Sequence, residues 1–429
     1  MSQFWRIIKK IPLTKPIYTF LKRQIVTLQN YIQNYLSYNK LKRVSNYHNH
    51  HLPIKVGFLT QVPECWQKTE PIFKEMIKRE EFEVYVIQVP PFDIIKNKVG
   101  DYSKENEYFE NLVDKKHTIK YEDFDLSSVD YLFYQRPYDP VYPNKLKSKN
   151  ASKYTKLCYI PYGPDDVRNF GTKPLSFFRN LSISFLEDSC NVALVKAKFN
   201  SKFNFRYNRF VNIGYPSFEQ MLKLEKKEKV ASTCRILWTP RWSYSPIIGG
   251  SHFFEYVNFI TSMALSSKIT LTIRPHPLMW ENFLKEKLIT IDQINKYKTK
   301  WNELNITLDN NQNVLDTFKR TDILISDTSS IVLMFFLTNK PIIFCKFNSA
   351  DYSELFKKII PGMYLVNTEE ELKKTINNLI KGIDPKKNIR ESIINEFSYH
   401  KSATYNIVEF IEKDYIENNF CSHEDSYIQ

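Results

Sequence analysis

A segment of four residues in the second half of the chain, RPHP at positions 274–277, carries side chains that can act on a phosphate. It follows a β-forming run at residues 269–274, and α/β proteins present their ligands at the carboxyl ends of strands. The two prolines stiffen the turn and hold Arg274 and His276 in fixed directions. A histidine held in this way can hydrogen-bond a phosphate oxygen or donate a proton to a leaving group. Taken alone, the segment is also compatible with a plain strand end.

A second polar segment, SDTSS at positions 326–330, lies between a predicted strand (DILIS) and an apolar helical run (IVLMFFLTN). Hydroxyl groups and free backbone N–H groups at the start of a helix form a site for phosphate. Ser and Asp are also the usual caps of helices, so a structural role is the alternative. A cap needs one residue, whereas Asp327, Thr328, Ser329 and Ser330 stand together here. The segment therefore favours ligand binding.

The elements that must position these segments alternate between short β-type runs and longer helical patterns. This alternation is typical of parallel sheets covered by helices on both faces, so the predicted fold class is α/β. In the first half, strands are expected at residues 54–60, 82–89, 129–135, 157–160, 191–195 and 210–214, with a helix at 65–79. In the second half, strands are expected at 235–239, 269–274, 305–308, 322–326, 341–344 and 363–366, with helices at 253–265, 314–319, 331–337 and 370–380.

The length of 429 residues is enough for two cores, and a charged, then small and polar stretch at residues 225–233 predicts the linker between them. We expect a basic amphipathic segment at 1–50 and an N-terminal Rossmann-like domain at 51–228. A C-terminal Rossmann-like domain is expected at 229–397, followed by a helix and polar tail at 398–429.

Three further segments extend the pattern: KPIIF at 340–344, GYP at 214–216 and TPRW at 239–242. In order and spacing, RPHP, SDTSS and these segments resemble the C-terminal half of the CDP-glycerol glycerophosphotransferases, over residues 157–347. Members of that family build poly(glycerol phosphate) and similar teichoic-acid or capsule polymers. The resemblance implies the GT-B fold, in which two Rossmann-like domains face each other across a cleft and the C-terminal domain holds the donor nucleotide.

The resemblance also implies roles for individual residues. His276, Ser329 and Ser330 would bind the donor, and Arg241 and Asp327 would assist. Arg241 and Arg274 suit the two phosphates of a CDP-linked donor, which leaves His276 to assist the departure of CMP. The remaining donor-side candidates are Thr328, and Gly250 with Ser251, since glycines let backbone N–H groups approach a phosphate.

The expected donor is CDP-glycerol or another cytidine nucleotide, and no further cofactor is expected. The sequence shows no obvious Asp-x-Asp metal motif, and cationic side chains with helix ends can take the place of a metal. The expected acceptor is lipid-linked or a growing polymer.

The sequence departs from the family in the N-terminal domain. Family members carry a histidine in a W-H-G-T-like turn, which is proposed to activate the acceptor hydroxyl. The matching stretch here, YIPYG at 159–163, has Tyr162 before Gly163 and no histidine. Asp165 or Asp166 can serve as the base if the loop faces the cleft. Capping of the following turn is the equal alternative.

The net charge of +14 is concentrated at the N-terminus, where residues 1–63 hold ten Lys and Arg and no Asp or Glu. Apolar and aromatic residues are mixed with these cations, as in helices that lie on an anionic membrane surface. A basic helix packed on the body of the protein is the alternative, and Pro12 and Pro16 interrupt the helical pattern. The segment matches no RNA-binding signature, so no nucleic-acid partner is expected.

The six cysteines lie far apart, without disulfide or metal-finger spacing, so reduced thiols are expected. The sequence contains no signal-peptide core and no apolar span of about 18 residues. The expected location is therefore the cytoplasm, peripheral on the inner face of the cell membrane.

These observations predict a transferase that moves glycerol phosphate, or a related polyol phosphate, from a CDP-linked donor to a hydroxyl of a membrane-linked acceptor or growing polymer, with release of CMP. Two alternatives remain open. His-Pro and Ser-Ser elements also occur in transferases that use CMP-sugars of the sialic acid or Kdo type. The other alternative is a non-catalytic membrane-surface protein that binds an anion.

Overall fold

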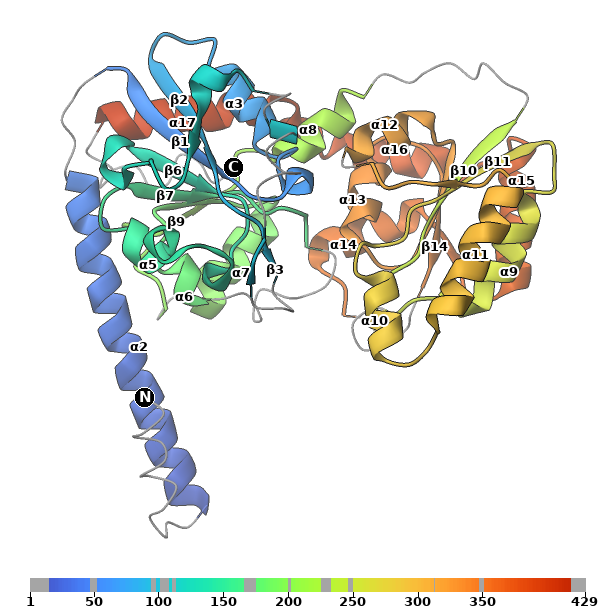
Figure 1. The fold of residues 1–429 in the computed structure, drawn as a ribbon, viewed down its shortest axis with the longest axis horizontal. Helices are drawn as coiled ribbons and strands as arrows, with labels where there is room; N and C mark the ends of the chain where they lie inside the picture. The colour runs from blue at the N-terminus through green and yellow to red at the C-terminus, as the bar shows by residue number, and fades with distance from the viewer. Residues whose placement is uncertain are drawn as a thin grey trace.

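Two parallel β-sheets, each accompanied by helices, form the body of the protein (Figure 1). The computed structural model describes residues 15–46, 52–93, 98–100, 108–109, 113–165, 175–199, 202–224, 233–245, 250–311, 313–346 and 351–417. Residues 225–232 of the predicted linker and residues 418–429 of the predicted tail lie outside these ranges.

The first sheet has seven parallel strands in the order β5-β2-β1-β6-β7-β8-β9. They are β1 (Ile54–Thr60), β2 (Phe82–Gln88), β5 (Thr118–Lys120), β6 (Tyr131–Tyr134), β7 (Lys156–Tyr159), β8 (Ile183–Phe185) and β9 (Arg209–Val211). A separate antiparallel pair consists of β3 (Phe92–Asp93) and β4 (Lys98–Val99). Strands β6 and β7 are buried along their whole length, as expected of a parallel sheet between helix layers. The strand order reverses between β1 and β6.

The second sheet has six parallel strands in the order β12-β11-β10-β13-β14-β15. They are β10 (Cys234–Thr239), β11 (Ile269–Ile273), β12 (Thr307–Leu308), β13 (Ile323–Ser326), β14 (Ile342–Cys345) and β15 (Tyr364–Val366). The order reverses between β10 and β13, which end in register with Thr239 opposite Ser326. The loops that follow these two strands therefore begin side by side.

Helices fill the intervals between the strands. Those in the first part are α3 (Glu70–Met76), α5 (Ser148–Ala151), α6 (Leu175–Phe178), α7 (Ser189–Phe199) and α8 (Pro216–Leu222). Those in the second part are α9 (Phe253–Met263), α10 (Met279–Lys285), α11 (Ile291–Glu303), α12 (Val314–Arg320), α13 (Ser330–Phe336), α14 (Glu354–Ile359), α15 (Glu369–Ile380) and α16 (Lys387–Asn395).

The C-terminal helix α17 (Ala403–Glu417) returns from the second sheet and runs along the first one (Figure 1). Its Asp414 is buried and accepts a hydrogen bond from the Lys156 ammonium of β7 at 2.7 Å. The same carboxylate binds the Tyr131 hydroxyl of β6 and the Arg209 guanidinium of β9. Three strands of the first sheet are thus attached to the end of the chain.

Helix α2 (Lys15–Asn46) projects away from the body for much of its length (Figure 1). Its last turns are anchored, because Leu41 and Val44 are buried and Lys40 donates to the Asn180 side chain at 2.7 Å. Pro16 lies in the first turn, where a missing N–H is tolerated, so the interruption predicted there is wrong; Pro12 lies outside the described residues. Within the described part of the chain, no helix combines the length and apolar character that crossing a bilayer requires.

Two predicted elements differ from the structure. The strand expected at residues 191–195 is wrong, because these residues belong to α7. A carboxylate oxygen of Asp188 accepts from the Asn191 backbone N–H at 2.9 Å and starts the helix there. The helix expected at 65–79 forms only at α3, since Pro71 is restricted to a first helical turn.

Candidate active site

A cleft of about 500 Å³ lies between the carboxyl ends of the two sheets and takes its walls from both. The first-sheet wall includes Lys68, Tyr138, Tyr162, Gly163 and Asp165, and the second-sheet wall includes Arg241, Arg274, His276, Thr328, Ser329 and Ser330. Most of the second wall comes from loops that follow β10, β11 and β13, the strands around the reversal of strand order. Open α/β sheets bind ligands at this position.

His276 lines the cleft as a neutral imidazole. The Leu278 backbone N–H donates to its Nδ1 at 3.1 Å, so the proton of the neutral ring lies on Nε2. Burial, with a contribution from the Arg241 charge, lowers the pKa of His276 to about 4. At neutral pH the ring therefore offers an N–H donor to a ligand, and not a positive charge.

Arg241 supplies a cation to the same wall. Its guanidinium donates to the Thr328 carbonyl and lies 5.9 Å from the centre of the Trp242 ring. The hydroxyl of Thr328 is buried and has no hydrogen-bond partner among the described residues. Its oxygen has no surface open to the cleft, so the residue contributes to this wall through its carbonyl bond to Arg241.

The two predicted donor-binding serines have different surroundings, although both line the cleft. The Ser329 hydroxyl accepts from the Ile331 backbone N–H at 3.4 Å and caps α13. Ser330 faces the opposite wall, because a Cβ atom added to Gly163 would lie 3.2 Å from its hydroxyl oxygen. Only Ser330 is positioned at the narrow approach between the walls.

Arg274 lines the cleft, but its guanidinium is already engaged. It donates to Asp309 at 2.7 Å and to the Asn311 carbonyl at 2.8 Å. These bonds balance its charge and fix the turn that carries His276. Arg274 thus differs from Arg241, whose guanidinium donates to a neutral carbonyl.

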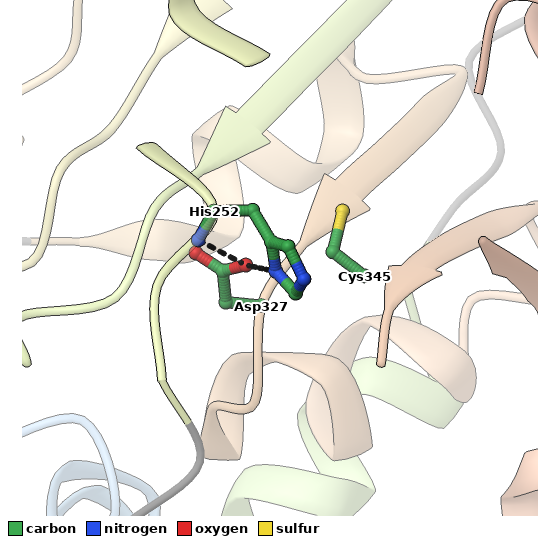
Figure 2. A group of neighbouring side chains, drawn as sticks. All are labelled: His252, Asp327 and Cys345. Carbon is green, nitrogen blue, oxygen red and sulfur yellow. Dashed lines mark hydrogen bonds and ion pairs between the residues drawn. The ribbon is translucent and has the colours of Figure 1, made fainter. Parts of the chain in front are cut away.

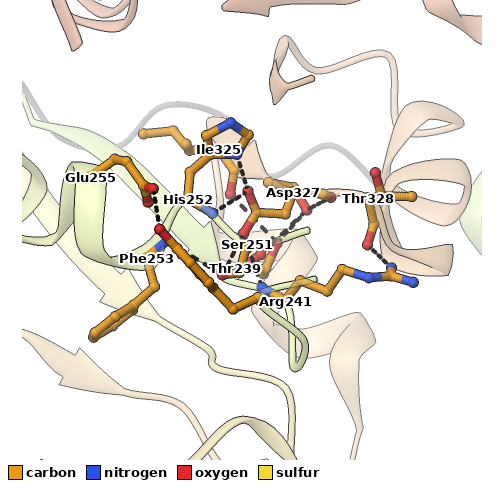
Figure 3. A network of polar contacts seen from close by, with 11 residues as sticks. Thr239, Arg241, Ser251, His252, Phe253, Glu255, Ile325, Asp327 and Thr328 are labelled. Carbon is orange, nitrogen blue, oxygen red and sulfur yellow. Dashed lines mark hydrogen bonds and ion pairs between the residues drawn. The ribbon is translucent and has the colours of Figure 1, made fainter. Parts of the chain in front are cut away.

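Asp327 and Ser251 lie behind this lining and form a buried network (Figure 3), and Gly250, which precedes Ser251, does not line the cleft either. The Asp327 carboxylate accepts from the backbone N–H groups of Arg241 (3.0 Å) and His252 (3.2 Å) and from the Ser251 hydroxyl (3.1 Å). Gly250 has a φ of 55° and donates its N–H to the Ser245 carbonyl. The network joins the loops after β10 and β13, so these residues position Arg241 and do not face the cleft themselves.

His252 lies between Asp327 and Cys345, as Figure 2 shows. Their potential ligand atoms all lie within 4.8 Å of one another. Nδ1 of His252 is 2.8 Å from the carboxylate, and burial, together with Asp327, raises the pKa of the Cys345 thiol well above its ordinary value. The Asp327 carboxylate is bonded to the backbone N–H groups of Arg241 and His252, to the Ser251 hydroxyl and to the His252 ring, which is the bonding of a structural network.

The acceptor side consists of the loop after β7. The Tyr162 hydroxyl lies 3.1 Å from that of Tyr138, and burial, then Tyr138, raises the pKa of Tyr162. The Asp165 backbone is held at both ends: its N–H donates to Glu187 at 3.0 Å, and its carbonyl accepts from the Ser353 hydroxyl at 2.6 Å. Ser353 caps α14, so this loop is attached to the second half of the molecule. Asp166 lies outside the described residues.

Lys68 was not predicted to be a functional residue. It lies between a 3-10 turn (Pro63–Cys65) and α3, is only 2% exposed, and lines the cleft. Its Nζ donates to the carbonyls of Gln135 and Ile160, both at 2.6 Å. These partners lie 67 and 92 residues away along the chain, so no local pattern indicates the site.

The profile of the CDP-glycerol:poly(glycerophosphate) glycerophosphotransferase family matches residues 191–413, more than half of the chain. The chain belongs to this family. It is therefore a CDP-glycerol glycerophosphotransferase-like enzyme, and the resemblance inferred from RPHP and SDTSS is confirmed. The matched range contains every second-sheet residue named above and excludes the YIPYG turn.

Comparison with solved structures confirms the predicted GT-B fold. The wall teichoic acid polymerase TagF is 13% identical, with 94% of this chain and 98% of that one covered at a TM-score of 0.57. A UDP-N-acetylglucosamine 2-epimerase is 13% identical, with coverages of 88% and 100% and a TM-score of 0.51. The S. aureus protein MnaA in complex with UDP is 11% identical, with coverages of 84% and 97% and a TM-score of 0.50. A search of curated protein sequences finds no match.

Proposed function

We propose that this glycerophosphotransferase moves glycerol phosphate, or a related polyol phosphate, from a CDP-linked donor to a hydroxyl of a membrane-linked acceptor or growing polymer, and releases CMP. The polymer would be a teichoic acid or a capsule of a bacterial cell surface. The observation that carries this proposal is the cleft, where the Arg241 cation, the neutral His276 N–H donor and the Ser330 hydroxyl lie together on one wall. TagF, whose fold is similar, is itself described as a wall teichoic acid polymerase.

The donor wall suits a diphosphate. Arg241 can make charge-assisted hydrogen bonds to phosphate oxygens, and Ser330 can donate its hydroxyl. When the acceptor oxygen attacks the phosphorus that bears glycerol, the bond from this phosphorus to CMP breaks and negative charge grows on the CMP oxygen. Nε2–H of His276 can stabilise that charge, and preorganised donors of this kind contribute strongly to catalysis.

Helix α2 supports a membrane-bound acceptor and a peripheral position on the inner face of the membrane. It carries six Lys and Arg and no acid. Large apolar side chains, among them Phe20, Leu28, Tyr31 and Tyr35, are more than half exposed on it. At 100° per residue, Leu28, Tyr31 and Tyr35 point away from the side on which Leu41 and Val44 are buried. An exposed apolar stripe with flanking cations suits an anionic lipid surface.

A donor panel tests the proposal. The full-length enzyme is incubated with CDP-glycerol, CDP-ribitol or a CMP-sugar, with and without a lipid-linked glycerol phosphate acceptor, and CMP release is measured by chromatography. We expect acceptor-dependent release from a CDP-polyol. Release from the CMP-sugar alone would instead establish the glycosyltransferase alternative, and binding without turnover of any donor would support the anion-binding alternative.

A further inference from the structure

Lys68 reaches the centre of the first sheet. It follows β1, and its Nζ contacts the carbonyls at the carboxyl ends of β6 and β7, through Gln135 and Ile160. The strand order of this sheet reverses between β1 and β6, so Lys68 lies at the position where open α/β sheets bind ligands. On the second sheet, the corresponding strand ends carry the donor-side residues.

The groups around Lys68 carry almost no negative charge to balance its protonated amine. The rings of Tyr159 and Tyr162 lie 4.9 and 5.8 Å from Nζ. Burial raises the pKa values of both tyrosines and of Cys65, so these neighbours are uncharged near neutral pH. The charged neighbour is Arg136, after β6, which is also positive.

Burial, reinforced by the positive charge of Arg136, lowers the pKa of Lys68 to about 7. The neutral and the protonated amine are therefore both populated at neutral pH. A neutral amine has two N–H bonds and one lone pair. The two carbonyls occupy both N–H bonds at 2.6 Å, which leaves the lone pair of the neutral amine without a hydrogen bond, on a residue that lines the cleft.

We propose that Lys68 is the general base of the acceptor side, where it takes the proton of the attacking hydroxyl. This role rests on the proposed function. The acceptor O–H bond breaks as its proton passes to Nζ, and the oxygen forms a bond to the phosphorus that bears glycerol. The bond between this phosphorus and the CMP oxygen breaks, and its electron pair leaves with CMP. The proton on Lys68 returns to solvent before the next turnover.

The acceptor loop favours Lys68 over the other candidates. The raised pKa of the Tyr162 hydroxyl makes this residue a poor base. Lys68 Nζ lies 5.8 Å from the centre of the Tyr162 ring, so its amine lies beside the same loop. Asp165 remains the competing carboxylate of the same wall.

The test compares kcat as a function of pH for the full-length enzyme and three variants, with saturating CDP-glycerol and a lipid-linked acceptor. In the wild type, log kcat should rise with an apparent pKa of about 7. Lys68→Met should lose this rise and lower kcat by roughly 100- to 10,000-fold, with CDP-glycerol affinity changed less than about threefold. Lys68→Arg, which keeps a cation but cannot lose its proton, should behave in the same way.

Lys386→Met is the matched control. The pKa of Lys386 is also lowered, by burial and then by Arg390, and its Nζ donates to the Pro361 carbonyl at 2.9 Å, but this residue does not line the cleft. It should leave both kcat and the rise of log kcat with pH intact. Asp165→Asn should also retain this rise of log kcat with pH.

Each failure has a distinct reading. Absence of CDP-glycerol turnover in the wild type would overturn the proposed function itself. A rise that persists in folded Lys68→Met or Lys68→Arg would show that Lys68 only joins the strand ends, and loss of the rise in Asp165→Asn would assign the base to that carboxylate. If both Lys68 variants fail to fold, the temperature dependence of the wild-type apparent pKa distinguishes Lys68 from Asp165. An amine pKa falls on warming, whereas a carboxyl pKa hardly changes.

Discussion

The tautomer of His276 determines what this residue can contribute to the reaction. Its Nδ1 accepts the Leu278 N–H, so the free ring nitrogen carries the proton. With a pKa of about 4, the ring stays neutral at every pH above about 5. A titration observed near neutral pH must therefore come from another group, which separates the contributions of His276 and Lys68.

We expect His276→Ala to lower kcat by about 100-fold or more, because the donor to the developing charge on CMP is lost. Steady-state CMP release from CDP-glycerol measures the effect. His117→Ala is a suitable control, since this histidine bonds to the Val84 carbonyl in the first sheet and does not line the cleft. A folded His276→Ala enzyme with normal turnover would disprove the role.

Ser329 and Ser330 provide a second test at the residue scale. Ser329→Ala removes the cap of α13 and should lower the free energy of unfolding by about 0.5–2 kcal/mol. Ser330→Ala should leave stability nearly unchanged and weaken CDP-glycerol binding by about 1 kcal/mol. Thermal unfolding and titration calorimetry on both variants distinguish the roles. Loss of stability in Ser330→Ala and loss of CDP-glycerol binding in Ser329→Ala would contradict them.

Donor-side residues could be predicted only in part. RPHP and SDTSS indicate strand ends that face a ligand, and His276, Thr328 and Ser330 do line the cleft. The same motif gives no sign that Asp327 points backward to hold the loop of Arg241. Spacing along the chain identifies a loop, whereas the direction of a side chain depends on partners contributed by distant strands.

At the scale of elements, α2 combines two functions along one helix. Its last turns pack on the body through Leu41, while its earlier turns expose apolar side chains. Arg179 strengthens the anchor by donating to Asn30 and Gln33, both at 2.6 Å. The helix is therefore held firmly at one end and free to present its stripe at the other.

We expect the triple variant Phe20→Ser, Leu28→Ser, Tyr31→Ser to bind anionic vesicles at least about tenfold more weakly, because each apolar side chain contributes on entering the lipid boundary. Co-sedimentation with phosphatidylserine and with phosphatidylcholine vesicles measures this. Leu41→Ala is the control: it should cost about 2–5 kcal/mol of stability and leave vesicle binding unchanged. Equal binding of the triple variant and wild type would refute the surface role.

The second sheet could be predicted more fully than the first. All six of its strands were expected, although β12 has only two residues. In the first sheet, β5 and β8 were not expected, and helix α11 of the second half was not expected either. The apolar run at 191–195 was assigned to a strand because its length fits one, while its helical state depends on the Asp188 cap.

At the scale of the whole molecule, Asp414 links the end of the chain to the first sheet. Burial would raise its pKa, but Arg209 and Lys156 outweigh this and hold the pKa well below its ordinary value. A depressed carboxyl pKa stabilises the fold above the unfolded-state value of about 4, and this contribution is lost as the pH falls further.

We expect Asp414→Asn to lower the free energy of unfolding by about 3–5 kcal/mol, because the buried Lys156 and the half-buried Arg209 lose their counter-charge. Urea titration at pH 7 measures it. Glu409→Gln, on the exposed side of the same helix, removes an ion pair with Arg79 and should cost less than about 1 kcal/mol. Equal losses of unfolding free energy in the two variants would show that the ion pairs of Asp414 stabilise the fold no more than the exposed pair of Glu409.

The return of α17 also sets the order in which this protein can mature on the ribosome. Strands β1 to β9 emerge long before residues 403–417, yet Ile407, Val408 and Ile411 complete the apolar core beneath them. A nascent chain therefore exposes that surface, with Lys156 and Arg209 lacking their acid, until translation is almost finished. A chain ended at residue 402 should accumulate as insoluble protein bound to chaperones, whereas one ended at residue 417 should be soluble, and fractionation of the two in cells provides the comparison.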